Sequence, residues 1–111
     1  MNELITFEEF SKIDCRVGTI IEIHDFPEAK LPAYKLTIDF GHLGLKKSSA
    51  QITTLYKKEE LLNKQIVELV NFPKKQIANY MSECIVLGAV SRQNFILLNH
   101  ENSVKNVTSV N

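Results

Sequence analysis

The chain of 111 residues lacks long apolar runs, and none of its apolar stretches approaches the roughly 20 residues of a membrane-spanning helix. Its first ten residues, MNELITFEEF, carry acidic side chains where a secretory signal would carry basic ones. Glycine and proline are scarce, with four and three copies, which excludes collagen-like and low-complexity chains. These absences favour one globular domain over residues 1–111, in the cytoplasm and without membrane contact.

Cysteine is scarce as well. Cys15 and Cys84 form neither a CxxC pair nor a cluster with histidine. In a cytoplasmic chain this pattern is typical of two buried free thiols, with a disulfide or a metal site as less favoured alternatives. The sequence therefore predicts no metal site and no cofactor.

Catalytic motifs are also missing from the sequence. The chain contains no GxSxG, P-loop, GxGxxG or HExxH. His24, His42 and His100 are scattered singly, and Ser48 and Ser49 would be nucleophiles only if a base lay beside them. We therefore expect a binding protein without catalytic residues, and not an enzyme.

The formal net charge is zero, but the charges are unevenly distributed along the chain. Residues 1–45 hold 4 Lys and Arg against 8 Asp and Glu, whereas residues 46–75 hold 7 lysines against 3 glutamates. Residues 76–111 hold 2 of each sign. We interpret the basic middle segment as the mark of a localised anionic partner, although a solvated face would also explain it.

The clearest helix signal lies near the N-terminus. Thr6 followed by Glu9 forms a capping box, and Ile5 and Phe10 occupy the two positions of a hydrophobic staple. This predicts a short helix over residues 7–12. The helix has too many apolar neighbours for a free surface, so these side chains need a core or a partner.

Most of the remaining pattern indicates β-strands. The long strand at residues 15–26 places Val17, Ile21 and Ile23 on one face, and Gly18 marks a bulge or a sharp bend. The segment 34–40 alternates strictly between apolar and polar residues and is the clearest strand. Further strands are expected at 65–70, 84–90 and 94–99, and the tail 103–110 is expected to pair as an edge strand. A loop is expected at 41–47 and a helical stretch at 55–64.

Turn signals recur about every ten residues, and, with the short stretch at 48–53 taken as the third strand, the second helix falls between the third and fourth strands. This arrangement favours an all-β fold with short helices. The specific prediction is a five-stranded Greek-key barrel of the oligonucleotide/oligosaccharide-binding (OB) type.

Two stretches could build a binding site. In GLKKSSAQIT, residues 44–53, Lys46 and Lys47 supply positive charge, while Ser48, Ser49 and Gln51 offer hydrogen-bond donors to phosphates or base edges. The small side chains there allow a ligand to approach the strand closely.

The second stretch is NFPKKQIANYMSE, residues 71–83. Asn71 can form hydrogen bonds with the polar edge of a base. Lys74 and Lys75 can bind phosphates, and Phe72 or Tyr80 can stack on a base. Taken singly, Phe72 is also a candidate core residue, and paired lysines are also typical of a solvated loop. The joint pattern favours single-stranded or looped RNA as the ligand.

Four segments together resemble a known family. DFPEAKLPAYKLTIDFG, GLKKSSAQIT, LLNKQIVELVNFP and SECIVLGAV resemble the CsaA family of small tRNA-binding-domain proteins, over about Phe7 to Leu98. That family is similar to the tRNA-binding domains of methionyl-tRNA synthetases and of the phenylalanyl-tRNA synthetase beta chain. The resemblance implies an OB barrel that forms a homodimer and binds tRNA. It also implies chaperone-like binding of unfolded or export-bound polypeptides in an apolar groove.

Carried over by position, the family's motifs match two sets of residues. The first set is Lys46, Ser48, Ser49 and Gln51, and the second is Asn71, Phe72, Pro73, Lys75, Ile77, Ala78, Ser82 and Glu83.

Three residues depart from the family pattern. Gln76 stands where a basic residue is usual, Asn79 where glycine is usual, and Met81 where lysine is usual. Asn79 suits a left-handed turn nearly as well as glycine does. Each lost positive charge should weaken tRNA binding and its salt dependence, and Met81 could extend an apolar groove for peptides.

Two hypotheses follow. In the first, the protein is a non-catalytic, dimeric tRNA-binding protein, with the helix at residues 7–12 and the C-terminal tail at the dimer seam. In the second, it is a chaperone-like binder of polypeptides in an apolar groove. The sequence does not indicate tRNA specificity or a docking partner.

Overall fold

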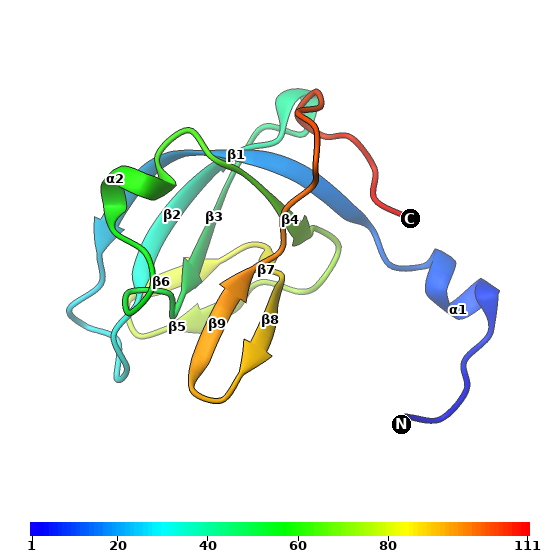
Figure 1. Cartoon of the computed structure of the whole chain (residues 1–111), viewed down its shortest axis with the longest axis horizontal. Coiled ribbons are helices and arrows are strands. Elements are labelled where there is room, and N and C mark those ends of the chain that lie inside the picture. Colours follow the sequence, from blue (N-terminus) through cyan, green and yellow to red (C-terminus); the bar gives the residue numbers. More distant parts are fainter.

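The computed structural model describes residues 1–111, which form a small β-barrel with two short helices (Figure 1). The elements, in chain order, are α1 (Phe7–Ser11), β1 (Cys15–Asp25), β2 (Tyr34–Asp39), the 3-10 turn η1 (Gly41–Leu43), β3 (Leu45–Ala50), α2 (Lys58–Leu61), β4 (Gln65–Leu69), β5 (Lys75–Ile77), β6 (Tyr80–Ser82), β7 (Ile85–Val86), β8 (Gly88–Ser91) and β9 (Asn94–Leu97).

Five antiparallel strands form the barrel in the order β3-β2-β1-β4-β7. The two edges of this sheet nearly meet, because Glu83, just before β7, bonds to Lys47 on β3. The Lys47 amide donates to Glu83 Oε1 at 2.9 Å, and the Glu83 amide donates to the Lys47 carbonyl at 2.7 Å. With α2 between β3 and β4, this arrangement confirms the predicted all-β, OB-type barrel.

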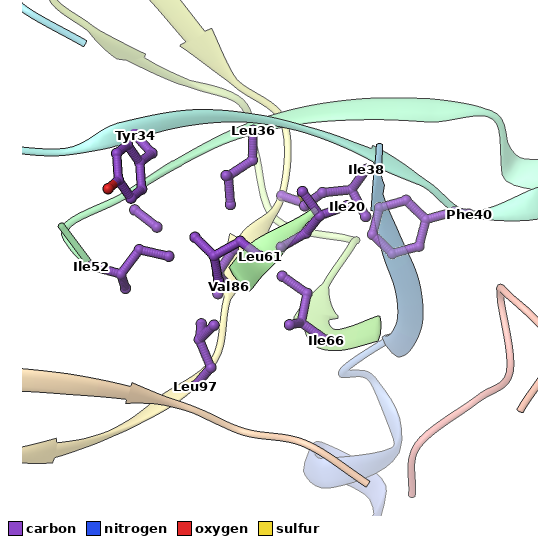
Figure 2. Close-up of a cluster of buried hydrophobic side chains, with 12 residues drawn as sticks. Ile20, Tyr34, Leu36, Ile38, Phe40, Ile52, Leu61, Ile66, Val86 and Leu97 are labelled. Carbon is purple, nitrogen blue, oxygen red and sulfur yellow. The ribbon is translucent and has the colours of Figure 1, made fainter. Parts of the chain in front are cut away.

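The barrel interior is apolar, and strand periodicity explains which residues fill it (Figure 2). Along β2, Tyr34, Leu36 and Ile38 point inward and alternate with half-exposed polar residues, as predicted. Leu61 of α2 is fully buried among them. Burying a side chain of this size stabilises the fold by roughly 1.5–3 kcal/mol.

The long strand β1 corrects two details of the sequence analysis. Its register shifts between Ile20 and Glu22, so the bulge lies beyond Gly18. Val17 and Ile20 are three positions apart and lie on opposite faces of the strand, Val17 in a small separate cluster and Ile20 in the core, and the bulge brings Ile23 to the same face as Ile20. Gly18 is needed for a different reason, because a Cβ there would lie 2.5 Å from Ile38 Cγ2.

Three other boundaries also differ from the predictions. Residues 45–47 belong to β3, so the expected loop is shorter. The connection between β4 and β7 contains the β5–β6 hairpin, whose three-residue strands are too short to show a period. The expected strand over residues 84–90 is split into β7 and β8 at Leu87.

The tail lies along the first residues of β1, which β2 leaves unpaired. The sequence predicts an edge strand there, and one bridge, between Arg16 and Ser109, has strand pairing. Backbone bonds join Val17 to Thr108 and Val107, and Cys15 to Val110, at 2.7–3.0 Å. The end of the chain is therefore fixed against the barrel.

The N-terminal helix has the predicted capping box, in which the Glu9 amide donates to Thr6 Oγ1 at 3.1 Å. None of the residues of α1 is buried, and the helix stands away from the barrel (Figure 1). Leu4 and Phe7 are 88% and 80% exposed. No helix of the structure has the length and apolar character needed to span a membrane.

Candidate functional site

A cavity of about 600 Å³ opens between β3, the β5–β6 hairpin and the β8–β9 hairpin. Its residues include two cations, Lys75 and Arg92, and no aspartate or glutamate. In a chain with 13 acidic residues, this absence makes the cavity electrostatically distinct. Field lines from the two cations are not cancelled locally, so the cavity attracts anions.

The structure brings six of the predicted site residues together around this cavity. They come from both predicted stretches and are Ser48, Ser49, Gln51, Phe72, Lys75 and Ser82. The other six, Lys46, Lys47, Asn71, Lys74, Tyr80 and Met81, do not line it.

The two serines on the cavity floor have their hydrogens committed. Ser48 Oγ donates to the Cys84 carbonyl at 3.0 Å, and Ser82 Oγ donates to the same oxygen at 3.2 Å. Each hydroxyl has one hydrogen, so Ser82, which is half-buried, keeps lone pairs for a ligand, whereas Ser48 is 1% exposed and serves the packing of the barrel. The sequence analysis expected donors at these positions, and the geometry instead makes Ser82 an acceptor.

Three lysines on the strands that border the cavity have no carboxylate within 4.0 Å of the side-chain nitrogen. Lys75 on β5 lines the cavity itself, whereas Lys46 and Lys47 precede the cavity residue Ser48 on β3 and point to opposite faces of that strand. Lys74 differs, because its Nζ lies 3.5 Å from Glu83 Oε2. This ion pair partly neutralises Lys74, so the unpaired positive charge is concentrated on the other three lysines and on Arg92.

Asn71 occupies a structural position. Its Oδ1 accepts from the Asp14 amide at 2.8 Å, and its Nδ2 donates to the Lys12 carbonyl at 2.6 Å. Both ends of the side chain thus hold the link between α1 and β1, and they are not directed at a ligand.

Tyr80 is likewise held by the barrel. Its ring packs edge-on against the ring of Phe26, with the two ring centroids 5.5 Å apart, and its hydroxyl donates to the Leu36 carbonyl at 3.2 Å. Burial, with smaller contributions from Cys84 and nearby carboxylates, raises the pKa of Tyr80 to about 12. By contrast, Phe72 is 47% exposed at the cavity, which rules out the core position considered for it.

The β5–β6 turn also differs from the expectation for Asn79. The residue with positive φ is Ala78, at 51°, while Gln76 Nε2 donates to the Ala78 carbonyl at 2.8 Å. Gln76 therefore supports the turn. Met81 pairs with Gln76 across the hairpin, and it is 43% exposed outside the cavity.

Sequence reasoning missed the contribution of the β8–β9 hairpin. Arg92, Gln93, Asn94 and Phe95 line the cavity from this side. Arg92 lies in the turn with a φ of 58°. The available signal was an arginine, one of two in the chain, placed between two apolar strands, but the sequence alone does not show which surface that turn faces.

The buried residues of the barrel include one acid. Glu68 on β4 has no exposed surface, and neither of its carboxylate oxygens has a hydrogen-bond partner. Burial raises its pKa to about 9, which keeps it protonated at neutral pH.

Both cysteines are free and buried, as predicted. Burial raises the pKa of both thiols, and the negative charge that Glu68 carries once it ionises at high pH raises it further, so that the pKa of Cys84 is about 12. They are therefore poor nucleophiles. The structure contains no cluster of three or more His, Cys, Asp or Glu side chains that could hold a metal ion.

A five-stranded barrel with unpaired lysines beside an acid-free cavity defines the class of oligonucleotide-binding barrels. Within that class, the chain belongs to the tRNA-binding domain family, whose model, described as "Putative tRNA binding domain", matches residues 15–109. This match and the structures described next confirm the predicted resemblance: the chain is a CsaA-like member of the tRNA-binding domain family.

Two solved structures support this assignment. The CsaA chaperone protein from Picrophilus torridus is 51% identical with a TM-score of 0.91, over 97% of this chain and 100% of that one. The chaperone CsaA from Bacillus anthracis str. Ames is 44% identical with a TM-score of 0.94, over 98% of this chain and 100% of that one.

A curated relative is the methionine–tRNA ligase of Pyrococcus horikoshii, 36% identical over 103 residues. The match covers 93% of this chain but 14% of the ligase. The similarity thus concerns a domain of an enzyme, and the domain family itself is named for binding tRNA.

Proposed function

We propose that this protein binds tRNA, without catalysing a reaction, through a basic face defined by Lys46, Lys47, Lys75 and Arg92. The carrying observation is that Lys75 and Arg92 line a cavity that has no carboxylate, in a protein of zero net charge, and that Lys46 and Lys47 lie on β3 directly before the cavity residue Ser48. Lysine and arginine neutralise phosphates and release counterions, which is the main source of affinity for nucleic acids.

The structure refines which predicted residues we assign to this face. Ser48, Ser49, Gln51, Phe72 and Ser82 belong to the cavity that the face surrounds. We assign secondary roles to Lys74, paired with Glu83, and to Asn71 and Tyr80, which are held by other contacts. The cytoplasmic location stays a prediction.

A titration of bulk tRNA at several salt concentrations tests this function. We expect binding at low salt and a linear fall of the logarithm of the affinity with the logarithm of the salt concentration. An unfolded polypeptide should not displace the tRNA. Absence of tRNA binding even at low salt would refute the proposal.

We also propose that the protein acts as a homodimer joined through α1 and the tail. The support is the apolar surface at the N-terminus, where Leu4, Ile5 and Phe7 are 62–88% exposed. A two-fold contact would bury these side chains. Two basic faces on one dimer would then bind one tRNA more tightly through effective concentration.

Light scattering at several protein concentrations tests the dimer. We expect twice the chain mass for the wild type and the chain mass for Phe7→Glu, whose side chain is 80% exposed and packs against Phe10 on the same helix, so the barrel should fold unchanged. Leu31→Glu, at a position 58% exposed, is the matched control and should stay dimeric. A wild type with the mass of one chain would contradict the proposal.

The second candidate function is chaperone-like binding of unfolded or export-bound polypeptides. It is favoured by the apolar side of the same cavity, which includes Ile85, Val86 and Val90, and by the chaperone names of the two CsaA structures. It predicts polypeptide binding that tolerates salt, since apolar contacts are not screened.

A further inference from the structure

We propose that the cavity between the two hairpins receives one unpaired nucleotide of a bound RNA, with the base inside and the phosphate at the rim. This inference rests on the proposed tRNA-binding function and assigns a role to the cavity. Four properties of the cavity support it: the chemistry of its floor, the charge of its rim, its aromatic side chains and its size.

The floor is matched to the edge of a base. Because the half-buried Ser82 donates its hydrogen to the Cys84 carbonyl at 3.2 Å, its oxygen is left as an acceptor toward the cavity, while Ser48, 1% exposed, holds the same carbonyl from below. The amino and imino groups of unpaired bases donate hydrogen bonds, and they find an acceptor in Ser82. A phosphate offers only acceptors at neutral pH, so the floor does not suit it.

The rim is matched to the phosphate. Lys75 enters from the β5–β6 hairpin and Arg92 from the turn of the β8–β9 hairpin, so the cations come from two separate elements. No lining residue is acidic, and no carboxylate lies within 4.0 Å of either cation. An arginine guanidinium suits a phosphate well because it forms two parallel hydrogen bonds.

The walls provide surfaces for stacking. Phe72 borders the cavity with 47% of its surface exposed, so its ring is available to a ligand. Phe95, half-buried against the core, borders it from β9, together with the apolar side chains of Ile77, Ile85 and Val90. Stacking of a base on an aromatic ring is a main source of affinity for single strands.

The size of the cavity, about 600 Å³, falls within the usual range for small-molecule sites. A nucleotide can enter only when it is unpaired, because a paired base is stacked inside its helix. An unfolded polypeptide would also find apolar walls, but it carries negative charge only where aspartate or glutamate occurs, whereas every nucleotide of an RNA carries a phosphate charge to match the two cations. The charge therefore favours RNA as the occupant.

The test compares two RNA probes by fluorescence anisotropy: a short blunt duplex, and the same duplex with a single-stranded 3′ overhang. We expect the wild type to prefer the overhang probe by about tenfold, as expected for stacking of one base. Phe72→Ala should abolish this preference and leave the affinity for the blunt duplex unchanged. For the overhang probe, Arg92→Gln should reduce the slope of the logarithm of the affinity against the logarithm of the salt concentration by the amount expected for about one phosphate contact.

Met81→Ala is the matched control. Met81 is 43% exposed, on the neighbouring hairpin and outside the cavity, so its removal deletes a similar apolar surface. It should keep the preference for the overhang probe.

Three outcomes would overturn the inference. The first is equal affinity of the wild type for both probes. The second is an equal loss of affinity for both probes in Phe72→Ala. The third is a loss, in Phe72→Ala, of affinity for a reduced and alkylated unfolded polypeptide while the overhang preference persists, which would identify a polypeptide site. Failure of the proposed function itself is distinguishable, because then neither probe nor tRNA would bind at low salt.

Discussion

The free energy of unfolding should decrease by about 1.4 kcal/mol per pH unit as the pH rises from about 4.5 toward 9, because Glu68 must stay protonated in the folded barrel. In the unfolded chain this carboxyl ionises near its ordinary pKa of 4.5, whereas burial raises its pKa in the folded chain to about 9. Within this window the folded state binds one proton more than the unfolded state. Glu68 thus contributes most stability below pH 4.5 and loses it as the pH rises.

Urea unfolding at a series of pH values measures this effect. The side chain of Glu68→Gln cannot ionise, so this variant should show a flatter dependence of the free energy of unfolding on pH. At pH 8 its free energy of unfolding should exceed that of the wild type by several kcal/mol, on the order of 1.4 kcal/mol for each pH unit above 4.5. Glu28→Gln removes an exposed carboxyl and is the matched control, which should keep the wild-type slope. Equal slopes for the wild type and Glu68→Gln would show that Glu68 is not the responsible group.

Exchanging Lys47 and Lys75 together for glutamate should lower the affinity for tRNA about hundredfold at low salt and reduce the salt dependence by about two phosphate contacts. Both side chains are exposed and free of carboxylate partners. Reversing their charge therefore removes two phosphate contacts and introduces repulsion. The backbone bonds of Lys47 to Glu83 do not depend on its side chain, so the barrel should remain closed.

A matched control distinguishes a local contact from the change in net charge. Lys30 and Lys57 are exposed, have no carboxylate within 4.0 Å of the side-chain nitrogen, and lie outside both the basic face and the proposed dimer seam. Lys30→Glu combined with Lys57→Glu changes the net charge equally and should retain most of the affinity. Equal losses for the two double variants, measured by the same titration, would mean that tRNA responds only to overall charge.

The fold could be predicted from the sequence where patterns are long or chemically specific. The alternation of Tyr34, Leu36 and Ile38 identified β2, and the pair of Thr6 and Glu9 identified the start of α1, because each reflects a local rule of backbone geometry. The strand expected at 94–99 is confirmed as β9, whereas the strands of the β5–β6 hairpin have three residues each, too short for a pattern, and packing decides them.

The site was predictable in its composition but not in its geometry. Lysines and serines on two stretches indicated a polyanion site, and six of the twelve residues do line one cavity. The sequence could not show that Asn71 is bonded to Lys12 and Asp14, nor that the hydrogens of Ser48 and Ser82 point inward. Hydrogen-bond direction and the role of Arg92 depend on contacts between residues far apart in the chain.

The pairing of the tail with β1 has a consequence for handling the protein. Residues 107–110 occupy backbone groups of Cys15 and Val17 that would otherwise form an open sheet edge beside apolar side chains. An open edge of this kind recruits strands from other molecules and leads to aggregation. Shortening the chain by these few residues would therefore threaten solubility more than folding, and a fusion partner placed there needs a linker that leaves the pairing intact.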